Sequence, residues 1–265
     1  MNEYRIKLGS FNKLNESVGL SFFDFLIKYN GGIYMPSKCD VYEPLKRKFD
    51  PNNFSEQLNW LLKPSGFLMF RNLKANFSGN IENKEKAIVY VTKNGQKVPF
   101  GNSKPSFFKY EITLRIKSER EDELILFLKN LYIAIGGDYA FLTLEADYVN
   151  QNFVKEVVFG GATIERFAGS NLNEFIPGVY WVNVYGKPYE ALVNKTIINN
   201  VVPFEELGNG DLLLKIYETP DAYNSLKALE LKDKFKEIVG GVYFFNKEKL
   251  SNEGGMYAYF KGKLV

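Results

Sequence analysis

The stretch Ile176–Gly186, IPGVYWVNVYG, decides the fold. A Pro-Gly turn opens it, aromatic and β-branched residues fill it, and a second glycine closes it. Tyr, Trp and Val suit a packed, pleated surface, and their order leaves no polar stripe for solvent. The stretch therefore predicts a strand that is buried on both faces at the centre of a sheet. It contains no reactive side chain, so its residues indicate structure and not chemistry.

Helix and strand patterns alternate on both sides of this stretch. Amphipathic helices are predicted over 16–29, 118–135 and 226–239, each followed by glycines that suit a helix end. Residues 107–117 alternate apolar with polar and charged side chains, which predicts a strand with one solvent-facing side. Asn94-Gly95 predicts a hairpin, because both residues tolerate positive φ. Short helices are predicted at 54–62 and 188–193, and further strands at 4–8, 66–73, 139–145, 211–218, 242–245 and 256–260.

These patterns predict an α+β fold, with a mixed, mainly antiparallel β-sheet and helices packed on it. No Pro- or Ser-rich linker divides the chain cleanly. We expect an N-terminal α+β part over 1–118 and a C-terminal α+β part over 119–265, packed as one compact unit. The stretches 54–72 and 204–218 both read as a short helix that runs into a strand, which leaves open the possibility of two similar halves.

Composition limits the chemistry that is available. The 265 residues include 34 basic and 31 acidic side chains, and this balance gives no argument for nucleic-acid binding. Histidine, the commonest general acid–base and metal ligand, is absent. The single cysteine, Cys39, excludes an internal disulfide and a Cys-cluster zinc site. No apolar signal core or membrane-length apolar window is present, so we expect a soluble, cytoplasmic protein.

Carboxylates are the remaining candidates for chemistry. Asp138, Glu145 and Asp147 flank one predicted strand, and Glu205-Glu206 precede another. Two such acids serve glycosidases or hold Mg²⁺, although acids at strand ends are also ordinary solvated residues. The chain has no phosphate-binding loop and no nucleophile elbow, so we predict no cofactor and no metal. A carboxylate-dependent hydrolase acting on a carbohydrate or phosphate substrate, and a structural or assembly protein, stay open as alternatives.

Residues 177–193, PGVYWVNVYGKPYEALV, resemble the Gly-x-Tyr-Trp-x-Asn-x-x-Gly segment of bacterial polymorphic-toxin immunity proteins. The family continues with a glycine turn, an apolar strand and a proline, similar to GDLLLKIYETP at 210–220. It closes with a helix and an aromatic segment, similar to IVGGVYFF at 238–245. Order and spacing agree over about 136–246. The resemblance implies that Gly178, Tyr180, Trp181 and Gly186 are structural core positions.

The resemblance also implies a function. Members of this family are non-enzymatic proteins that bind and neutralise a cognate toxin, often a nuclease delivered by a type VI or contact-dependent system. The implied partner is therefore a toxin protein, with no nucleic acid and no membrane, and the oligomeric state is open. If the toxin is a nuclease, carboxylates would meet its basic substrate groove, and Asp138, Glu145 and Asp147 are the candidates for that role.

Overall fold

The structure is a computed structural model that describes residues 1–84, 90–93, 96–99, 108–157, 163–167, 176–193 and 195–247. The chain forms two compact units. Unit 1 contains Met1 and Ile6–Gly137, and unit 2 contains Asn2–Arg5 and the residues from Asp138 onward. Strand β1 (Asn2–Ser10) therefore contributes residues to both units. The division falls after Gly137 and not after residue 118 as predicted, so the helix that follows residue 118 belongs to unit 1.

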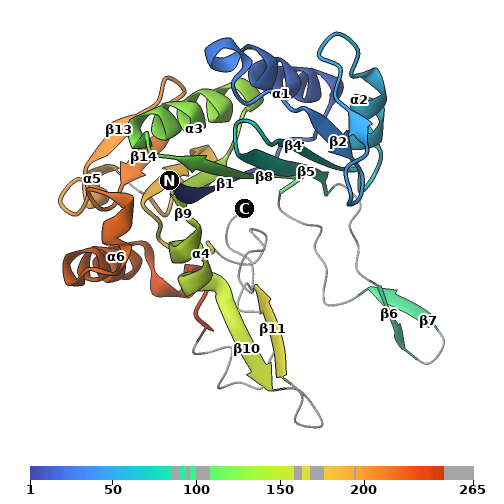
Figure 1. Ribbon diagram of the computed structural model, residues 1–265. Coiled ribbons are helices and arrows are strands. Elements are labelled where there is room, and N and C mark those ends of the chain that lie inside the picture. Colours follow the sequence, from blue (N-terminus) through green and yellow to red (C-terminus); the bar gives the residue numbers. More distant parts are fainter. Residues whose placement is uncertain are drawn as a thin grey trace. The chain divides into compact units, whose positions relative to one another are not determined.

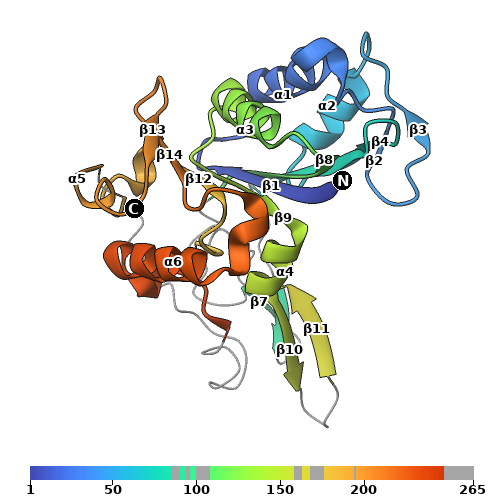
Figure 2. The ribbon, with the colours of Figure 1, turned by 60° about the vertical axis from the view of Figure 1, so that its left-hand side comes forward.

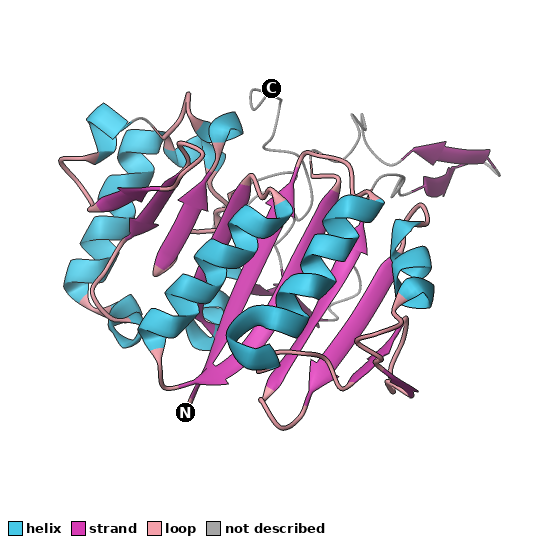
Figure 3. Cartoon of the chain, turned by 90° about the horizontal axis from the view of Figure 1, so that it is seen from above, coloured by secondary structure: helices cyan, strands magenta, loops and turns pink. Residues whose placement is uncertain are grey.

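Unit 1 is an α+β unit whose strands follow the order β1-β8-β5-β4-β2-β3. The pairs from β8 to β3 are antiparallel. Helices α1 and α3 cover one face of these strands (Figures 1 and 3). After β1, the elements are α1 (Glu16–Lys28), η1 (Tyr29–Gly32), β2 (Lys38–Asp40), β3 (Arg47–Lys48), α2 (Ser55–Leu62), β4 (Phe67–Asn72), β5 (Phe77–Asn83), β6 (Tyr90–Lys93), β7 (Gln96–Pro99), β8 (Tyr110–Ser118) and α3 (Glu121–Ile135).

Aromatic packing explains why α3 belongs to unit 1. The ring of Phe127 on α3 has its centroid within 5.3 Å of Phe25, 5.1 Å of Tyr29 and 4.7 Å of Tyr34. Aromatic pairs at such distances add to the free energy gained by burying apolar area. The hydrophobic face of α3 is therefore buried against the segment that contains α1, which a boundary drawn from sequence spacing did not capture.

The predicted solvent-facing side of β8 is only partly exposed. Arg115 and Lys117 are exposed, but Glu111 is buried and forms ion pairs with Lys7 at 3.2 Å and Lys84 at 2.9 Å. Burial alone would raise the pKa of the Glu111 carboxyl, but the two ammonium groups outweigh it and lower that pKa below its usual value. The charged side of this strand is thus partly an internal ion cluster.

Unit 2 is also an α+β unit. Its strands follow the order β13-β14-β12-β9, with β1 next to β9, and the described pairs from β13 to β9 are antiparallel. The hairpin of β10 and β11 extends from the end of α4 (Figure 2). The elements are β9 (Tyr139–Leu144), α4 (Glu145–Asn152), β10 (Phe153–Val157), β11 (Thr163–Phe167), β12 (Val182–Tyr185), η2 (Lys187–Tyr189), α5 (Lys195–Ile198), β13 (Phe204–Glu206), β14 (Leu212–Lys215), η3 (Pro220–Asn224), α6 (Leu226–Val239) and η4 (Gly241–Tyr243).

Several local predictions differ from the structure. Residues 204–206 form strand β13 paired with β14, not a helix, so the expected likeness between 54–72 and 204–218 is wrong at this point. Residues 241–243 form a 3₁₀ turn, followed by a single parallel bridge between Phe244 and Ile176. The strands on either side of residues 94–95 pair as predicted, while those two residues and 256–260 lie outside the described residues.

Tyrosines form much of the core of unit 2. Tyr139 and Tyr185 face each other across β9 and β12, with ring centroids 5.4 Å apart, and Tyr189 packs against both. Burial raises the pKa of the Tyr139 and Tyr185 hydroxyls well above the usual value for tyrosine. The folded unit therefore holds these phenols in their neutral form.

This core predicts a loss of stability at alkaline pH. Below about pH 10 the free energy of unfolding should not depend on these tyrosines, because they are protonated in both states. Above that pH the unfolded chain loses their protons and the folded chain keeps them, so each contributes a loss of about 1.4 kcal/mol per pH unit. Urea unfolding on both sides of this pH measures the slope.

The variant Tyr185→Phe provides the control. The buried Tyr185 hydroxyl has no hydrogen-bond partner among the described residues, so its removal should leave stability at neutral pH nearly unchanged. The alkaline slope of the variant should be shallower than that of the unaltered chain. Equal slopes would show that the Tyr185 hydroxyl does not contribute to the alkaline loss of stability.

Candidate functional site

Residues 176–186 form a short strand, β12, preceded by an irregular segment. Strand β12 lies between β9 and β14, with Val182 opposite Leu142 on one side and Lys215 on the other. Before it, the Asn183 side chain bonds the backbone of Tyr180: its Nδ2 donates to the Tyr180 carbonyl at 2.8 Å, and its Oδ1 accepts from the Tyr180 N–H at 3.3 Å. The Asn183 amide thus does for residue 180 what a neighbouring strand would do, so the strand is shorter than predicted.

Helix α4 supplies the other backbone partners of this segment. Gln151 accepts from the Val179 N–H at 3.2 Å and donates to the Val179 carbonyl at 3.0 Å. Asn152 donates to the Pro177 carbonyl at 2.9 Å and accepts from the Tyr180 hydroxyl at 2.6 Å. Two adjacent amide side chains therefore satisfy the polar backbone of a buried, non-regular stretch, as buried N–H and C=O groups require.

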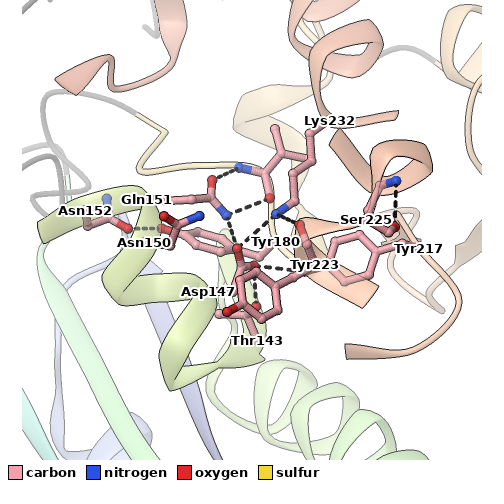
Figure 4. A network of polar contacts seen from close by, with 12 residues as sticks. Thr143, Asp147, Asn150, Gln151, Asn152, Tyr180, Tyr217, Tyr223, Ser225 and Lys232 are labelled. Carbon is pink, nitrogen blue, oxygen red and sulfur yellow. Dashed lines mark hydrogen bonds and ion pairs between the residues drawn. The ribbon is translucent and has the colours of Figure 1, made fainter. Parts of the chain in front are cut away.

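Asp147, also on α4, lies at the centre of the polar network (Figure 4). One carboxylate oxygen accepts from the Thr143 hydroxyl at 2.7 Å and the Tyr217 hydroxyl at 2.8 Å. The other accepts from the Gln151 amide and the Lys232 ammonium, both at 2.9 Å. Four donors occupy the acceptor positions of an ionised carboxylate, and Lys232 balances its charge.

The burial of Asp147 corrects one sequence-based assignment. The exposed fraction of its side chain is 0%, and that of Lys232 is 5%. A buried charge that is paired and fully hydrogen-bonded is the arrangement under which burial of a charge is tolerated. Asp147 therefore acts inside unit 2, and it offers no atom to the surface of a partner. Its place in the predicted acidic contact surface is wrong for this physical reason.

Glu145, at the start of α4, is held differently. Both of its carboxylate oxygens accept from the guanidinium of Arg5, at 2.7 and 2.6 Å, and this guanidinium lies 3.9 Å from the centroid of the Tyr148 ring. The Glu145 side chain keeps 22% of its area exposed. It is a paired carboxylate at the edge of the surface.

Asp138 lies at the opposite end of the same strand. It is partly exposed, it precedes β9, and its carbonyl accepts from the Gly186 N–H at 2.8 Å. Glu145 follows β9, so the six residues of that strand separate the two acids by about 20 Å. The structure therefore does not bring Asp138, Glu145 and Asp147 together in one site.

The structure describes all of the other candidate residues that the sequence singled out. The four core candidates are buried: Gly178, Tyr180, Trp181 and Gly186. Glu205 and Glu206 are exposed on β13, and Glu206 pairs with Lys195 at 2.7 Å. Among the described residues, no three His, Cys, Asp or Glu side chains gather into a group that could hold a metal ion. None of the helices described is long and apolar enough to cross a membrane.

Sequence reasoning missed the partners of Asp147. Thr143 and Gln151 are four residues before and after it, and this spacing on a helix is a local signal that could have found Gln151. Lys232 reaches Asp147 from 85 residues away, and Tyr217 from 70. No local sequence pattern predicts that these two residues contact Asp147.

The ion pair predicts a large effect of single substitutions. Lys232→Met leaves a buried carboxylate without its counter-charge and should lower the free energy of unfolding by about 3–5 kcal/mol. Asp147→Asn combined with Lys232→Met should lower it by less than the sum of the two single changes, because no unpaired charge remains. Urea unfolding followed by Trp181 fluorescence in a Trp60→Phe background measures unit 2.

The control for these substitutions is Lys234→Met. Lys234 is an exposed lysine on α6, the helix that carries Lys232, and its substitution should change the free energy of unfolding by no more than about 0.5 kcal/mol. Additive effects of the Asp147 and Lys232 substitutions would show that the two groups do not depend on each other.

Gly178 provides a second prediction. A Cβ at this position would lie 2.3 Å from Oε1 of Gln151 and displace the amide that bonds Val179. Gly178→Ala should therefore destabilise unit 2 by about 1–3 kcal/mol, as overpacking does. Gly208→Ala is the matched control, because a Cβ there meets nothing within 4 Å. Equal unfolding midpoints for the two variants would contradict the close approach.

Comparison with solved structures gives a likeness at low sequence identity. The sequence matches no protein-family model and no curated protein. Among solved structures, a chain from the crystal structure of the toxic C-terminal tip of CdiA from Pseudomonas aeruginosa in complex with immune protein is similar to 54% of this chain, and 86% of that chain is covered. The sequence identity is 13% and the TM-score is 0.25, so the functional argument rests on the residues of this chain alone.

Proposed function

We propose that this protein is a non-catalytic immunity protein that binds and neutralises a cognate bacterial toxin in the cytoplasm. A nuclease effector is the toxin class that the sequence resemblance favours. In this role the chain is a scaffold that presents a binding surface, and none of its side chains makes or breaks a covalent bond.

The observation that carries the proposal is how the Gly-x-Tyr-Trp-x-Asn-x-x-Gly segment is used. Tyr180 and Asn183 direct their polar groups inward, to Asn152 and to the backbone. Gly178 allows Gln151 to approach, and the Gly186 N–H bonds the carbonyl before β9. The segment that resembles immunity proteins is therefore an internal framework. The resemblance implies the same structural role for these positions.

The hydrolase alternative loses support from the same contacts. Asp147 has four hydrogen-bond donors around its carboxylate, and Glu145 is held by both arms of the Arg5 fork. Asp138 is about 20 Å from Glu145, beyond the separation of paired glycosidase carboxylates, roughly 5–10 Å. These three acids do not form the pair that such a reaction needs.

Two of the predicted contact acids stay in the proposal. Asp138 and Glu145 are partly exposed at the two ends of β9. A stable protein interface buries about 800 Å² on each partner, which is wide enough to include both positions. We propose that these two carboxylates take part in binding the toxin, while Asp147 supports the scaffold behind them.

Affinity capture tests the function. The tagged protein is incubated with lysate of its source cells, and a stoichiometric partner is identified by mass spectrometry. The C-terminal domain of that partner should stop the growth of a host strain, and co-expression of this protein should restore growth. Recovery of the protein alone would favour an assembly role, and a captured partner without toxicity would contradict neutralisation.

Substitution of the two acids tests the contact surface. Asp138→Asn with Glu145→Gln should weaken toxin binding at least about tenfold, since each removes a charge from the interface. Glu230→Gln with Asp233→Asn, two exposed acids on α6, makes the same charge change elsewhere and should leave affinity unchanged. Calorimetric titration gives both affinities, and unfolding curves confirm that each variant is folded. Equal affinities of the two double variants would remove these acids from the interface.

A further inference from the structure

The strands of unit 1 have a second face, opposite the helices, that carries a line of basic side chains. Phe70 on β4 packs against Phe22 of α1, with ring centroids 5.6 Å apart, so the next residue, Arg71, lies on the other face. Cross-strand partners share a face, and the register therefore places five residues in one row across β3, β2, β4, β5 and β8: Lys48, Lys38, Arg71, Ser78 and Arg115. We call the four cations the basic row.

The side chains of the basic row repel one another when no anion is bound to them. Lys38 is directly opposite both Lys48 and Arg71, in strands about 4.8 Å apart. Like charges in that arrangement destabilise a sheet. Among the described residues, none of these three cations forms an ion pair. The nearest acid in register, Asp40, uses its carboxylate on the N–H groups of Val41 and Lys46.

Arg71 supplies an independent observation. Its Nε is shielded from solvent and has no hydrogen-bond partner in the described chain. An unpaired buried donor costs free energy, and the guanidinium keeps its positive charge at this partly exposed position. Ser78 is directly opposite Arg71 in the register, so it lies on the same face of the sheet.

An ordinary explanation covers part of the row. Lysine on a short edge strand prevents edge-to-edge pairing, and Lys48 lies on the two-residue strand β3 at the end of the strand order. This explanation does not extend to Arg71 on β4, which lies between two other strands. The same face of β4 also carries the partly exposed Met69 and Phe67.

We propose that the basic row, with Arg71 at its centre, is a docking surface for an acidic segment of the protein partner. A partner carboxylate pairs with the partly exposed side chain of Arg71, and Lys38 and Lys48 attract neighbouring acids. Apolar side chains of the same segment pack on Met69 and Phe67. This inference rests on the proposed function and deepens it, because it adds a second, acidic part of the toxin surface to the contact proposed for Asp138 and Glu145.

A labelled peptide tests the surface without knowledge of the partner. A short fluorescein-labelled oligoglutamate is titrated with the whole protein, and fluorescence anisotropy gives the affinity, with oligoglutamine of equal length as the uncharged probe. Oligoglutamate should bind and oligoglutamine should not. Lys38→Gln with Arg71→Gln should weaken binding at least about tenfold, as expected when a charged hydrogen bond is lost.

The control variant is Lys227→Gln with Lys234→Gln, two exposed lysines of α6, which removes the same charge elsewhere and should leave the affinity unchanged. Lys38→Gln alone should raise the unfolding midpoint, because it relieves repulsion across the row. Absence of oligoglutamate binding, or equal weakening in both double variants, would overturn the proposal. Tighter, Arg71-dependent binding of a single-stranded oligothymidylate would also overturn it and assign the row to nucleic acid.

The toxin from the capture experiment separates this inference from the function it rests on. If Lys38→Gln with Arg71→Gln still binds and neutralises that toxin, the docking surface is wrong and the immunity function stands. If no toxin is captured and oligoglutamate binding still depends on Arg71, the surface stands and the immunity function falls.

Discussion

Unit 2 depends on the buried ion pair between Asp147 and Lys232. Removing a carboxylate and an ammonium from water costs several kcal/mol for each ion, and only close pairing with full hydrogen bonding offsets that cost. The pair is made from α4 and α6, and Tyr217, which follows β14, completes it. The requirement that all of these groups meet at one carboxylate fixes how the helices of this unit pack against its strands. A shift of either helix would leave a charge unpaired.

The same helix α4 links this constraint to the aromatic segment. Gln151 bonds Asp147 on one side and Val179 on the other, so the position of the segment follows from the position of the ion pair. This explains why a recognisable sequence pattern contains no reactive group. Its glycine, aromatic and asparagine residues are needed for the geometry of the scaffold. Proteins that share one scaffold can present different binding surfaces.

Much of the fold could be predicted from the sequence because its signals are local. The helices α1 and α6 agree with the predicted ranges to within one residue, since apolar spacing and end glycines act within a few turns. The candidate site was predictable only in part. Glu111 and Asp147 read as solvated acids, because the lysines that neutralise them come from distant parts of the chain. The strand at 176–186 was predicted too long because the bond of Asn183 to Tyr180 is visible only in the fold.

The division of β1 between the two units has a consequence for how the chain is made. Unit 2 takes Asn2–Arg5 from the beginning of the chain and everything else from residue 138 onward. Its first strand therefore leaves the ribosome long before Glu145, the residue that fixes Arg5. A fragment that starts at Asp138 would lack Arg5, whose guanidinium pairs with Glu145 at the start of α4. Unit 2 is therefore not a contiguous piece of the gene that can be moved on its own.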